Sequence, residues 1–362
     1  MQSFKNLSIL VSRIIVHVLP IIFLMFSRKR DRNHYFFKYF CLFRYLSFHS
    51  ALKGRSETLS ARKFFQEASE EYVLPGNSAC QGCGSTLALR WVLKALGKKT
   101  VIVNPASCGC VYVGLYPRTA VSVPYIQMAF AAGPAAASGM VGGLEAQGKK
   151  DVTVICWAGD GGTADIGVSS LSGSAERNTN YIYFCYDNEA YMNTGTQRSG
   201  STPAGAWTTT TPLGKKESKK DMALIMAAHR VPYVATSCSS YPADLYGKTK
   251  KAKLIQGMRY IHILTPCPPG WRFDTGLAVK IGRLAVQSGM WLLYEVENGV
   301  FRLSPPSRKI LENPEKRVPV KEYIRAQGRF RGMSENEITL LQEMIDSKLE
   351  KVAELDGKPL FF

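Results

Sequence analysis

One strand–helix–strand segment constrains the fold of this 362-residue chain more than any other feature. Residues 152–158 form an apolar, β-branched run that is typical of a buried strand, and the run ends in Gly-Asp-Gly-Gly at residues 159–162. Residues 164–177 follow with helical spacing of apolar side chains, and residues 181–186 form a second apolar run. Two buried strands joined through a helix predict parallel neighbours in one sheet.

Polar side chains follow both predicted strands at the point where each strand ends. Asp160 follows the first strand, and Asn188 follows the second. Because ligands bind at the carboxyl ends of parallel strands, we expect these two side chains to lie close together. Their oxygens and a nearby backbone carbonyl, most simply that of Ala190, suit Mg²⁺ on a phosphorylated ligand. The sequence therefore predicts a magnesium–diphosphate site, and the alternative is a glycine turn with a capping aspartate.

The same alternation of helical and apolar segments continues from residue 86 to residue 296. It predicts an α/β fold with a mainly parallel sheet that has helices on both faces. Residues 301–331 contain several prolines among mixed charges and predict an extended arm, and residues 334–355 predict a capped helix with one apolar stripe. His262 lies inside a predicted strand, so we expect a structural role for it.

The cysteines suggest a metal or cluster site. Cys80 and Cys83 form a C-x₂-C pair among glycines, which alone fits zinc, an iron–sulfur cluster or a redox dithiol. Loops after two further predicted strands carry Cys108 and Cys267. Other candidates for the third and fourth ligand are Cys110 and Cys238, whereas two cysteines inside apolar strands, Cys156 and Cys185, are expected to be core residues.

The segment from residue 159 to residue 188 resembles the motif of thiamine diphosphate (TPP) enzymes. Its continuation, residues 187–195 (DNEAYMNTG), is similar to β subunits of pyruvate:ferredoxin oxidoreductase, or pyruvate synthase, in the 2-oxoacid:ferredoxin oxidoreductase family. This resemblance covers about residues 70–330. It implies a TPP-binding fold and the oxidative decarboxylation of pyruvate with coenzyme A to acetyl-CoA and CO₂. Electrons would pass through a [4Fe–4S] cluster to ferredoxin.

The expected site residues divide into three groups. The resemblance implies that the cluster is held by Cys80, Cys83, Cys108 and Cys267. Magnesium is expected on Asp160, Asn188 and Ala190, and we expect Asn193 to act as a catalytic residue. The residues expected to bind TPP are Gly159, Asp160, Gly161, Gly162, Asn188, Ala190, Tyr191, Thr194 and Gly195.

Some parts of the expected enzyme are missing from this sequence. No glutamate is placed to contact the aminopyrimidine ring of TPP, and no second ferredoxin-type cysteine run is present. The resemblance implies that α, γ and δ subunits supply these parts, so the chain alone should not catalyse the reaction. The alternatives are a β subunit for 2-oxoisovalerate or 2-oxoglutarate, a non-redox TPP enzyme, and a zinc-stabilised subunit without catalysis.

The positive charge of the chain is concentrated near its N-terminus. Residues 1–63 carry a formal charge of +10, and the rest of the chain carries only +8 without a basic stripe, so we expect no nucleic-acid role. Residues 1–68 are expected to be a leader, either from an incorrectly assigned start or a membrane anchor. Residues 69–299 should then form the TPP and iron–sulfur domain, and residues 300–362 the arm and helix. Nine cysteines without a cleavable export sequence favour the reducing cytoplasm.

Overall fold

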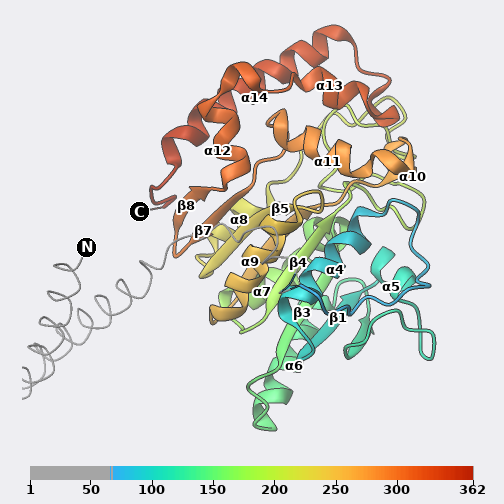
Figure 1. The fold of residues 1–362 in the computed structure, drawn as a ribbon, viewed down its shortest axis with the longest axis vertical. Helices are drawn as coiled ribbons and strands as arrows, with labels where there is room; N and C mark the ends of the chain where they lie inside the picture. Colours follow the sequence, from blue (N-terminus) through green and yellow to red (C-terminus); the bar gives the residue numbers. More distant parts are fainter. Residues whose placement is uncertain (1–65, 67, 362) are drawn as a thin grey trace, which may run out of the picture. The chain divides into compact units, whose positions relative to one another are not determined.

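The structure is a computed structural model that describes residue 66 and residues 68–361 (Figure 1). The predictions about a leader, whether a wrong start or a membrane anchor, therefore lie almost wholly outside the described residues. Within the described part, no helix is both long and apolar enough to span a bilayer. Residues 68–361 belong to one compact unit.

An eight-stranded sheet forms the centre of this unit, in the order β2-β1-β3-β4-β6-β5-β7-β8. All neighbours from β2 to β5 in that order are parallel, and β7 and β8 add an antiparallel hairpin at one edge. The strands are β1 (Thr100–Pro105), β2 (Tyr125–Met128), β3 (Thr153–Gly159), β4 (Ile182–Asp187), β5 (Tyr233–Cys238), β6 (Arg259–Leu264), β7 (Tyr294–Glu297) and β8 (Val300–Leu303).

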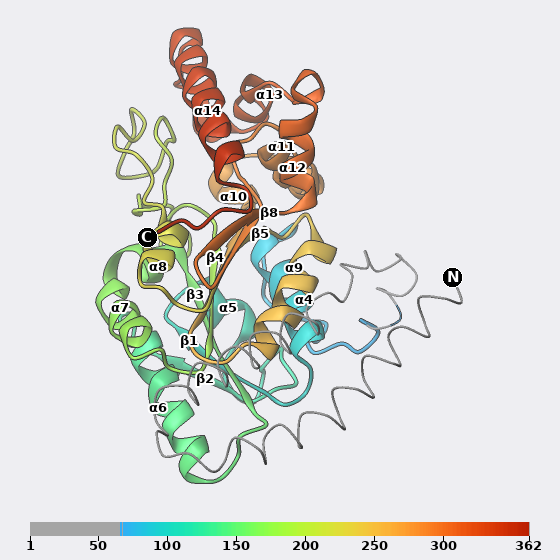
Figure 2. The same ribbon diagram turned by 90° about the vertical axis from the view of Figure 1, so that its left-hand side faces the viewer.

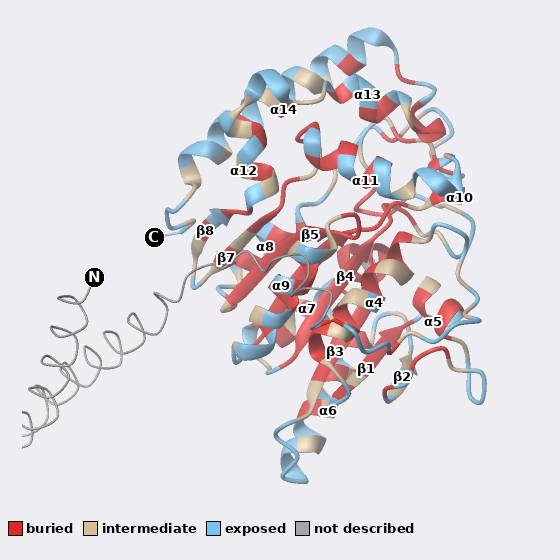
Figure 3. Cartoon of the chain, viewed as in Figure 1, coloured by how far each residue is buried: buried red, intermediate tan, exposed pale blue. Residues whose placement is uncertain are grey.

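Helices cover both faces of the sheet, as Figure 2 shows. One face carries α4 (Gly84–Leu96), α5 (Cys108–Val113) and α9 (Pro242–Leu254); the other carries α6 (Gly133–Ala146), α7 (Val168–Glu176) and α8 (Met222–Ala228). Strand residues alternate between the two cores: Trp157 packs in one and Cys156 in the other. The strands are buried throughout the centre (Figure 3), which explains why they read as continuous apolar runs. This arrangement confirms the predicted fold class.

The prediction of an extended arm at residues 301–331 was wrong. That segment contains strand β8 and several short helices: α12 (Pro305–Glu312), η3 (Pro314–Lys316), α13 (Val320–Arg325) and η4 (Gly328–Phe330). Its prolines begin these helices, since a proline is tolerated in a first helical turn, where its missing N–H has no partner to lose. The hairpin β7–β8 also carries the chain across the boundary expected at residue 300.

Helix α14 (Glu335–Leu355) confirms the helix predicted for the C-terminal region. Ser334 and Glu337 form a capping box at its start, and the stripe residues Ile338, Ile345 and Leu349 are buried in the same core as the sheet. The stripe therefore packs on this chain. The remaining helices are α10 (Pro268–Trp271), η2 (Thr275–Leu277), α11 (Ala278–Gln287) and the π-helical turn η1 (Gly162–Ile166).

The strand order places a switch point between β1 and β3. The chain goes from β1 to β2 on one side, whereas β3 and β4 lie on the other. Loops that leave the carboxyl ends of such neighbouring strands diverge to opposite faces and open a crevice. The ends of β1, β3, β4 and β6 lead directly into the loops with Cys108, Asp160, Asn188 and Cys267.

Candidate active site

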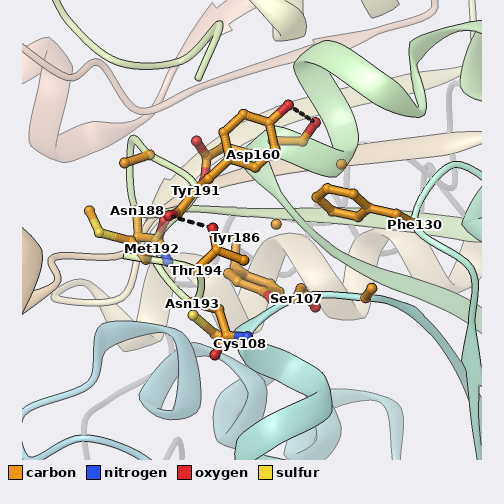
Figure 4. A pocket seen from close by; sticks show the side chains of 15 residues that line it. Ser107, Cys108, Phe130, Asp160, Tyr186, Asn188, Tyr191, Met192, Asn193 and Thr194 are labelled. Atoms are coloured by element: carbon orange, nitrogen blue, oxygen red, sulfur yellow. Dashed lines mark hydrogen bonds between the residues drawn. The ribbon is translucent and has the colours of Figure 1, made fainter. Parts of the chain in front are cut away.

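A cavity of about 160 Å³ lies at the carboxyl ends of β1, β3 and β4 (Figure 4). Most of the residues predicted to bind the cofactor line it, and Gly195 does not. The sequence did not predict five other lining residues, which come from the β1 and β2 loops, the end of β4 and the loop after it: Ala106, Ser107, Phe130, Tyr186 and Met192. The predicted residues in the wall are Gly159, Asp160, Gly161, Gly162, Asn188, Ala190, Tyr191, Asn193 and Thr194.

The side-chain amide of Asn188 meets oxygen atoms of two other wall residues. One side-chain atom of the Asn188 amide lies 3.0 Å from Asp160 Oδ1 and 2.9 Å from the carbonyl oxygen of Ala190. With nitrogen at that position, the amide donates hydrogen bonds to both oxygens. When the amide turns its oxygen to that position, as it can around a cation, each of the two separations matches the roughly 3 Å edge of an octahedron whose bonds are about 2.1 Å long, as around Mg²⁺. The donor set therefore fits a magnesium ion.

Asp160 is buried beside this point and carries a carboxylate that needs compensation. The hydroxyl of Ser199 donates to its Oδ2 at 2.5 Å. Burial, followed by the charge of Asp187, raises the pKa of Asp160 well above its ordinary value. A bound cation would oppose both effects, because it favours the ionised carboxylate.

Tyr191 covers the turn that follows β3. A side chain at Gly161 would meet the Tyr191 ring at 2.5 Å, so only glycine fits beneath the ring. The Tyr191 hydroxyl donates to Asp165 Oδ2 at 3.1 Å, and the same oxygen accepts the Gly200 amide at 2.8 Å. Asp165 lies in the π-helical turn η1, a type of irregularity common at functional sites. The sequence did not predict these hydrogen bonds between η1 and the loop after β4.

A buried ionic network lies behind the Asn188 turn. Asp187 Oδ2 pairs with Lys219 Nζ at 2.6 Å and with His262 Nε2 at 2.8 Å. Although burial alone would raise the pKa of Asp187, Lys219 and His262 hold it below its ordinary value. His262 also shares a hydrogen bond of 2.9 Å with the Tyr260 hydroxyl. Its place in the network agrees with the structural role expected for His262.

A second cavity, of about 70 Å³, is lined by all four predicted cysteines, Cys80, Cys83, Cys108 and Cys267. Burial and the neighbouring cysteines raise the pKa of Cys108 to about 12 and that of Cys267 to about 12. Thiols that raise one another's pKa in this way call for a cationic centre, which would stabilise them as thiolates. Among the described residues, however, no three Cys, His, Asp or Glu side chains lie close enough to hold a single metal ion.

The rival ligands lie elsewhere. Neither lines the cysteine cavity. Cys238 is buried in the core with its thiol 3.7 Å from the Gly282 carbonyl, and Cys110 lies 3.1 Å from the Asn104 amide. The strand residues Cys156 and Cys185 are fully buried, as expected of core cysteines.

Local structure explains the shape of the cysteine cavity. Gly82 adopts a φ of +71°, and a side chain there would meet the Thr275 carbonyl at 2.4 Å, so the turn between Cys80 and Cys83 requires glycine. Of the hydroxyls that line this cavity, those of Ser85 and Tyr112 bond to each other at 2.8 Å. Thr265 lines the same cavity, and its buried hydroxyl has no hydrogen-bond partner among the described residues. It is free to donate to a sulfur atom there.

The two cavities share part of their walls. Cys108, Asn188 and Asn193 line both. In Figure 4, Cys108 and Asn193 lie at one end of the cofactor cavity, and Asp160 and Tyr191 lie at the other. A group bound at the oxygen cluster and a group bound by the cysteines would therefore be neighbours.

Comparison with known proteins adds independent findings. Residues 107–263 match the family "Thiamine pyrophosphate enzyme, C-terminal TPP binding domain". The chain is 50% identical over 288 residues to pyruvate synthase subunit PorB of Methanothermobacter marburgensis, covering 78% of this chain and 98% of that relative. It is 45% identical over 302 residues to ketoisovalerate oxidoreductase subunit VorB of Pyrococcus horikoshii, covering 80% and 95%. A 2-oxoglutarate:ferredoxin oxidoreductase structure from Magnetococcus marinus aligns at 23% identity and TM-score 0.49, covering 60% of this chain and 80% of the other.

Proposed function

This chain belongs to the family of TPP-binding 2-oxoacid oxidoreductase subunits that includes pyruvate synthase PorB, and from that premise we propose that it is the β subunit of a pyruvate:ferredoxin oxidoreductase. The reaction is the oxidative decarboxylation of pyruvate with coenzyme A, which gives acetyl-CoA and CO₂, with ferredoxin as the electron acceptor. Residues 69–299 hold the cofactors. The wider family activity, an oxidoreductase reaction with TPP, is shared by the pyruvate and ketoisovalerate relatives.

The observation that carries the proposal is the approach of Asn188 to both Asp160 and Ala190 within 3.0 Å. These three residues would hold Mg²⁺, which in turn would hold the diphosphate of TPP at the start of η1. When bound, TPP supplies an electron sink that allows a 2-oxoacid to lose CO₂. Ser199 orients the Asp160 carboxylate, Tyr191 covers the diphosphate turn, and Asn193 offers an amide to the substrate end of the cavity.

The four cysteines support a cluster as the electron-accepting group. A [4Fe–4S] cluster holds its four thiolates around a cube, whereas zinc brings its ligands to about 2.3 Å from one atom. All four cysteines line one cavity, which supports a cluster held by four thiolates. The wall shared through Cys108 gives electrons a short path out of the cofactor cavity.

The size of the cofactor cavity supports a dependence on partners. Pockets that enclose a cofactor-sized molecule usually measure about 300–1,000 Å³. The cavity here measures about 160 Å³, and among its lining residues Asp160 provides the one carboxylate. We infer that a second carboxylate, needed against the aminopyrimidine ring, comes from another chain. We assign it to the α subunit of a cytoplasmic complex that also contains γ and δ subunits.

The test is an assay of the assembled complex with a viologen acceptor and coenzyme A. Pyruvate, 2-oxoisovalerate and 2-oxoglutarate are compared at equal concentrations, and kcat/KM should be highest for pyruvate. A clear preference for 2-oxoisovalerate would support the second candidate, to which the VorB relatives at 45% identity point. The isolated chain should show no turnover with any of the three, and turnover by it would contradict the assigned dependence on partners.

A further inference from the structure

The turn that carries Asn188 and Ala190 has a conformation that needs support. Glu189, between them, has a φ of +64°, which is uncommon for a residue with a side chain. Its carboxylate is also buried, with 5% of the residue exposed. A left-handed backbone and a buried charge at one position persist only where the surroundings hold them in place. The residues that hold Glu189 therefore help to fix the two neighbouring oxygen donors.

Two hydrogen bonds and two ion pairs hold Glu189, although its Oε2 atom, which pairs with Arg329, forms no hydrogen bond within the described residues. Its amide donates to Asp187 Oδ1 at 2.8 Å, and its carbonyl oxygen accepts the Thr202 hydroxyl at 2.7 Å. Its carboxylate forms ion pairs of 2.7 Å with Lys219 and with Arg329. Arg329 stands out among these partners because it comes from η4, in the C-terminal region.

Arg329 also reaches Asn188 by a second route. Its guanidinium lies 3.7 Å from the centre of the Trp271 ring, and Trp271 Nε1 donates to the Asn188 carbonyl at 2.7 Å. One buried cation thus touches Glu189 directly and supports Asn188 through the indole. The guanidinium itself is held by Gln327 Oε1 at 3.0 Å and by the Tyr323 hydroxyl at 3.1 Å.

The charges in this region are closely balanced. Two buried carboxylates, Asp187 and Glu189, face two cations, Lys219 and Arg329. Lys219 already pairs with both carboxylates, so loss of Arg329 would leave Glu189 with Lys219 as its remaining ion-pair partner among the described residues. The carboxylate of Glu189 would then gain by turning toward solvent, and that rotation would release the strained turn.

We propose that Arg329 is a positioning residue for the magnesium site: through Glu189 and Trp271 it sets the orientation of the Asn188 and Ala190 oxygens. The inference rests on the proposed function, since it assumes that these oxygens bind a divalent cation. It gives the C-terminal region a part in cofactor binding although none of its residues lines the cofactor cavity. Partners behind metal ligands commonly change metal affinity about 10- to 100-fold when removed.

The experiment measures Mn²⁺ binding by the full-length chain in its assembled complex, with TPP saturating, from the loss of the free-ion EPR signal. Arg329→Met should weaken Mn²⁺ binding at least about tenfold, and Arg329→Lys, which keeps the charge but not the flat stack on Trp271, should weaken it less. The matched control is Arg325→Met. Arg325 is an exposed arginine in the same region, paired with Glu335 at 2.8 Å, and its loss should leave Mn²⁺ binding unchanged.

A double variant tests the route through Glu189. If Arg329 acts through that residue, Glu189→Gln combined with Arg329→Met should bind Mn²⁺ no worse than Arg329→Met alone. A lower Tm for Arg329→Met with unchanged Mn²⁺ binding overturns the inference and leaves Arg329 a purely structural role. If Arg329→Met does not fold, Arg329→Lys and Glu189→Gln decide by the same measurement. Failure of the unchanged complex to bind Mn²⁺ with TPP overturns the proposed function itself.

Discussion

Asn188 and Asp160 leave the ends of the adjacent strands β4 and β3, and their side chains meet at 3.0 Å. The contact is possible because the two parallel strands end at the same edge of the sheet. Because burial raises the pKa of Asp160, the carboxylate is costly without a cation, and the cation is what the two side chains are suited to hold.

Asp160→Asn should abolish the stabilisation of the complex by TPP and Mg²⁺. At ligand concentrations about 100 times Kd, that stabilisation amounts to about 2.7 kcal/mol in the unchanged protein. Without ligands the variant should melt no lower than the unchanged protein, because a buried carboxylate has been replaced by a neutral amide. Differential scanning calorimetry with and without the two ligands measures both effects. Asp151→Asn, at an exposed aspartate paired with Lys99, is the control and should keep the full shift.

Substitution of the cavity cysteines should remove iron. Cys83→Ser and Cys267→Ser should each lose most of the roughly four iron atoms per chain, together with the broad visible absorbance that dithionite bleaches. Cys110→Ser should retain both, because Cys110 does not line the cysteine cavity. Metal analysis and absorbance spectra of the complex, purified without oxygen, provide the measurement. About one zinc per chain and no colour would instead establish the zinc alternative.

Thr265→Val should make the reduction potential of the cluster more negative. Thr265 lines the cysteine cavity, and its hydroxyl has no partner in the part of the chain that the structure describes. The hydroxyl can therefore donate to a cluster sulfur, and that bond would stabilise the reduced cluster, which carries more negative charge. Such a bond to a charged acceptor contributes at most about 1.5–3 kcal/mol. An EPR-monitored redox titration measures the shift, and Thr265→Ser should keep the original potential. Equal potentials for all three proteins would show that the hydroxyl does not contact the cluster.

Ser334→Ala should destabilise the C-terminal region. Ser334 caps α14, and loss of such a cap costs about 1 kcal/mol. Hydrogen bonds from the Ser334 backbone and side chain lower the pKa of Glu337. The Glu337 carboxylate therefore contributes to the free energy of unfolding at pH values above its ordinary pKa. This contribution is lost as the pH falls through the lowered pKa. Urea unfolding at pH 7 and at pH 3 should therefore show a smaller difference between Ser334→Ala and the unchanged protein at pH 3. An equal difference at both pH values would exclude the Glu337 contribution.

The parts of the structure that could be predicted are those that short sequence patterns indicate. The approach of Asp160 to Asn188 follows from two apolar strands, each ending in a polar residue, because parallel strands end at one sheet edge. The four cysteines could be placed on loops after strands or in a glycine turn for the same reason. The capping box at Ser334 is a short-range pattern that needs only neighbouring residues to form.

The parts that could not be predicted depend on distant segments. Arg329 lies beside Glu189 only because the C-terminal helices fold back on the sheet, and nothing near either residue indicates that contact. Phe130 enters the cavity wall from the loop after β2, and the place of that loop depends on the pairing of β2 with β1. The prolines in residues 305–319 were misread because a proline fits the start of a short helix as well as it fits an extended segment.

The Tyr191 ring over Gly161 has a consequence for the evolution of the family. Any side chain at position 161 would occupy the space of the ring, so the two positions cannot vary independently. A relative that carries alanine or serine at position 161 should also carry a smaller residue at position 191. In such relatives the tie to Asp165 would disappear as well, and the loop after β4 would need another anchor.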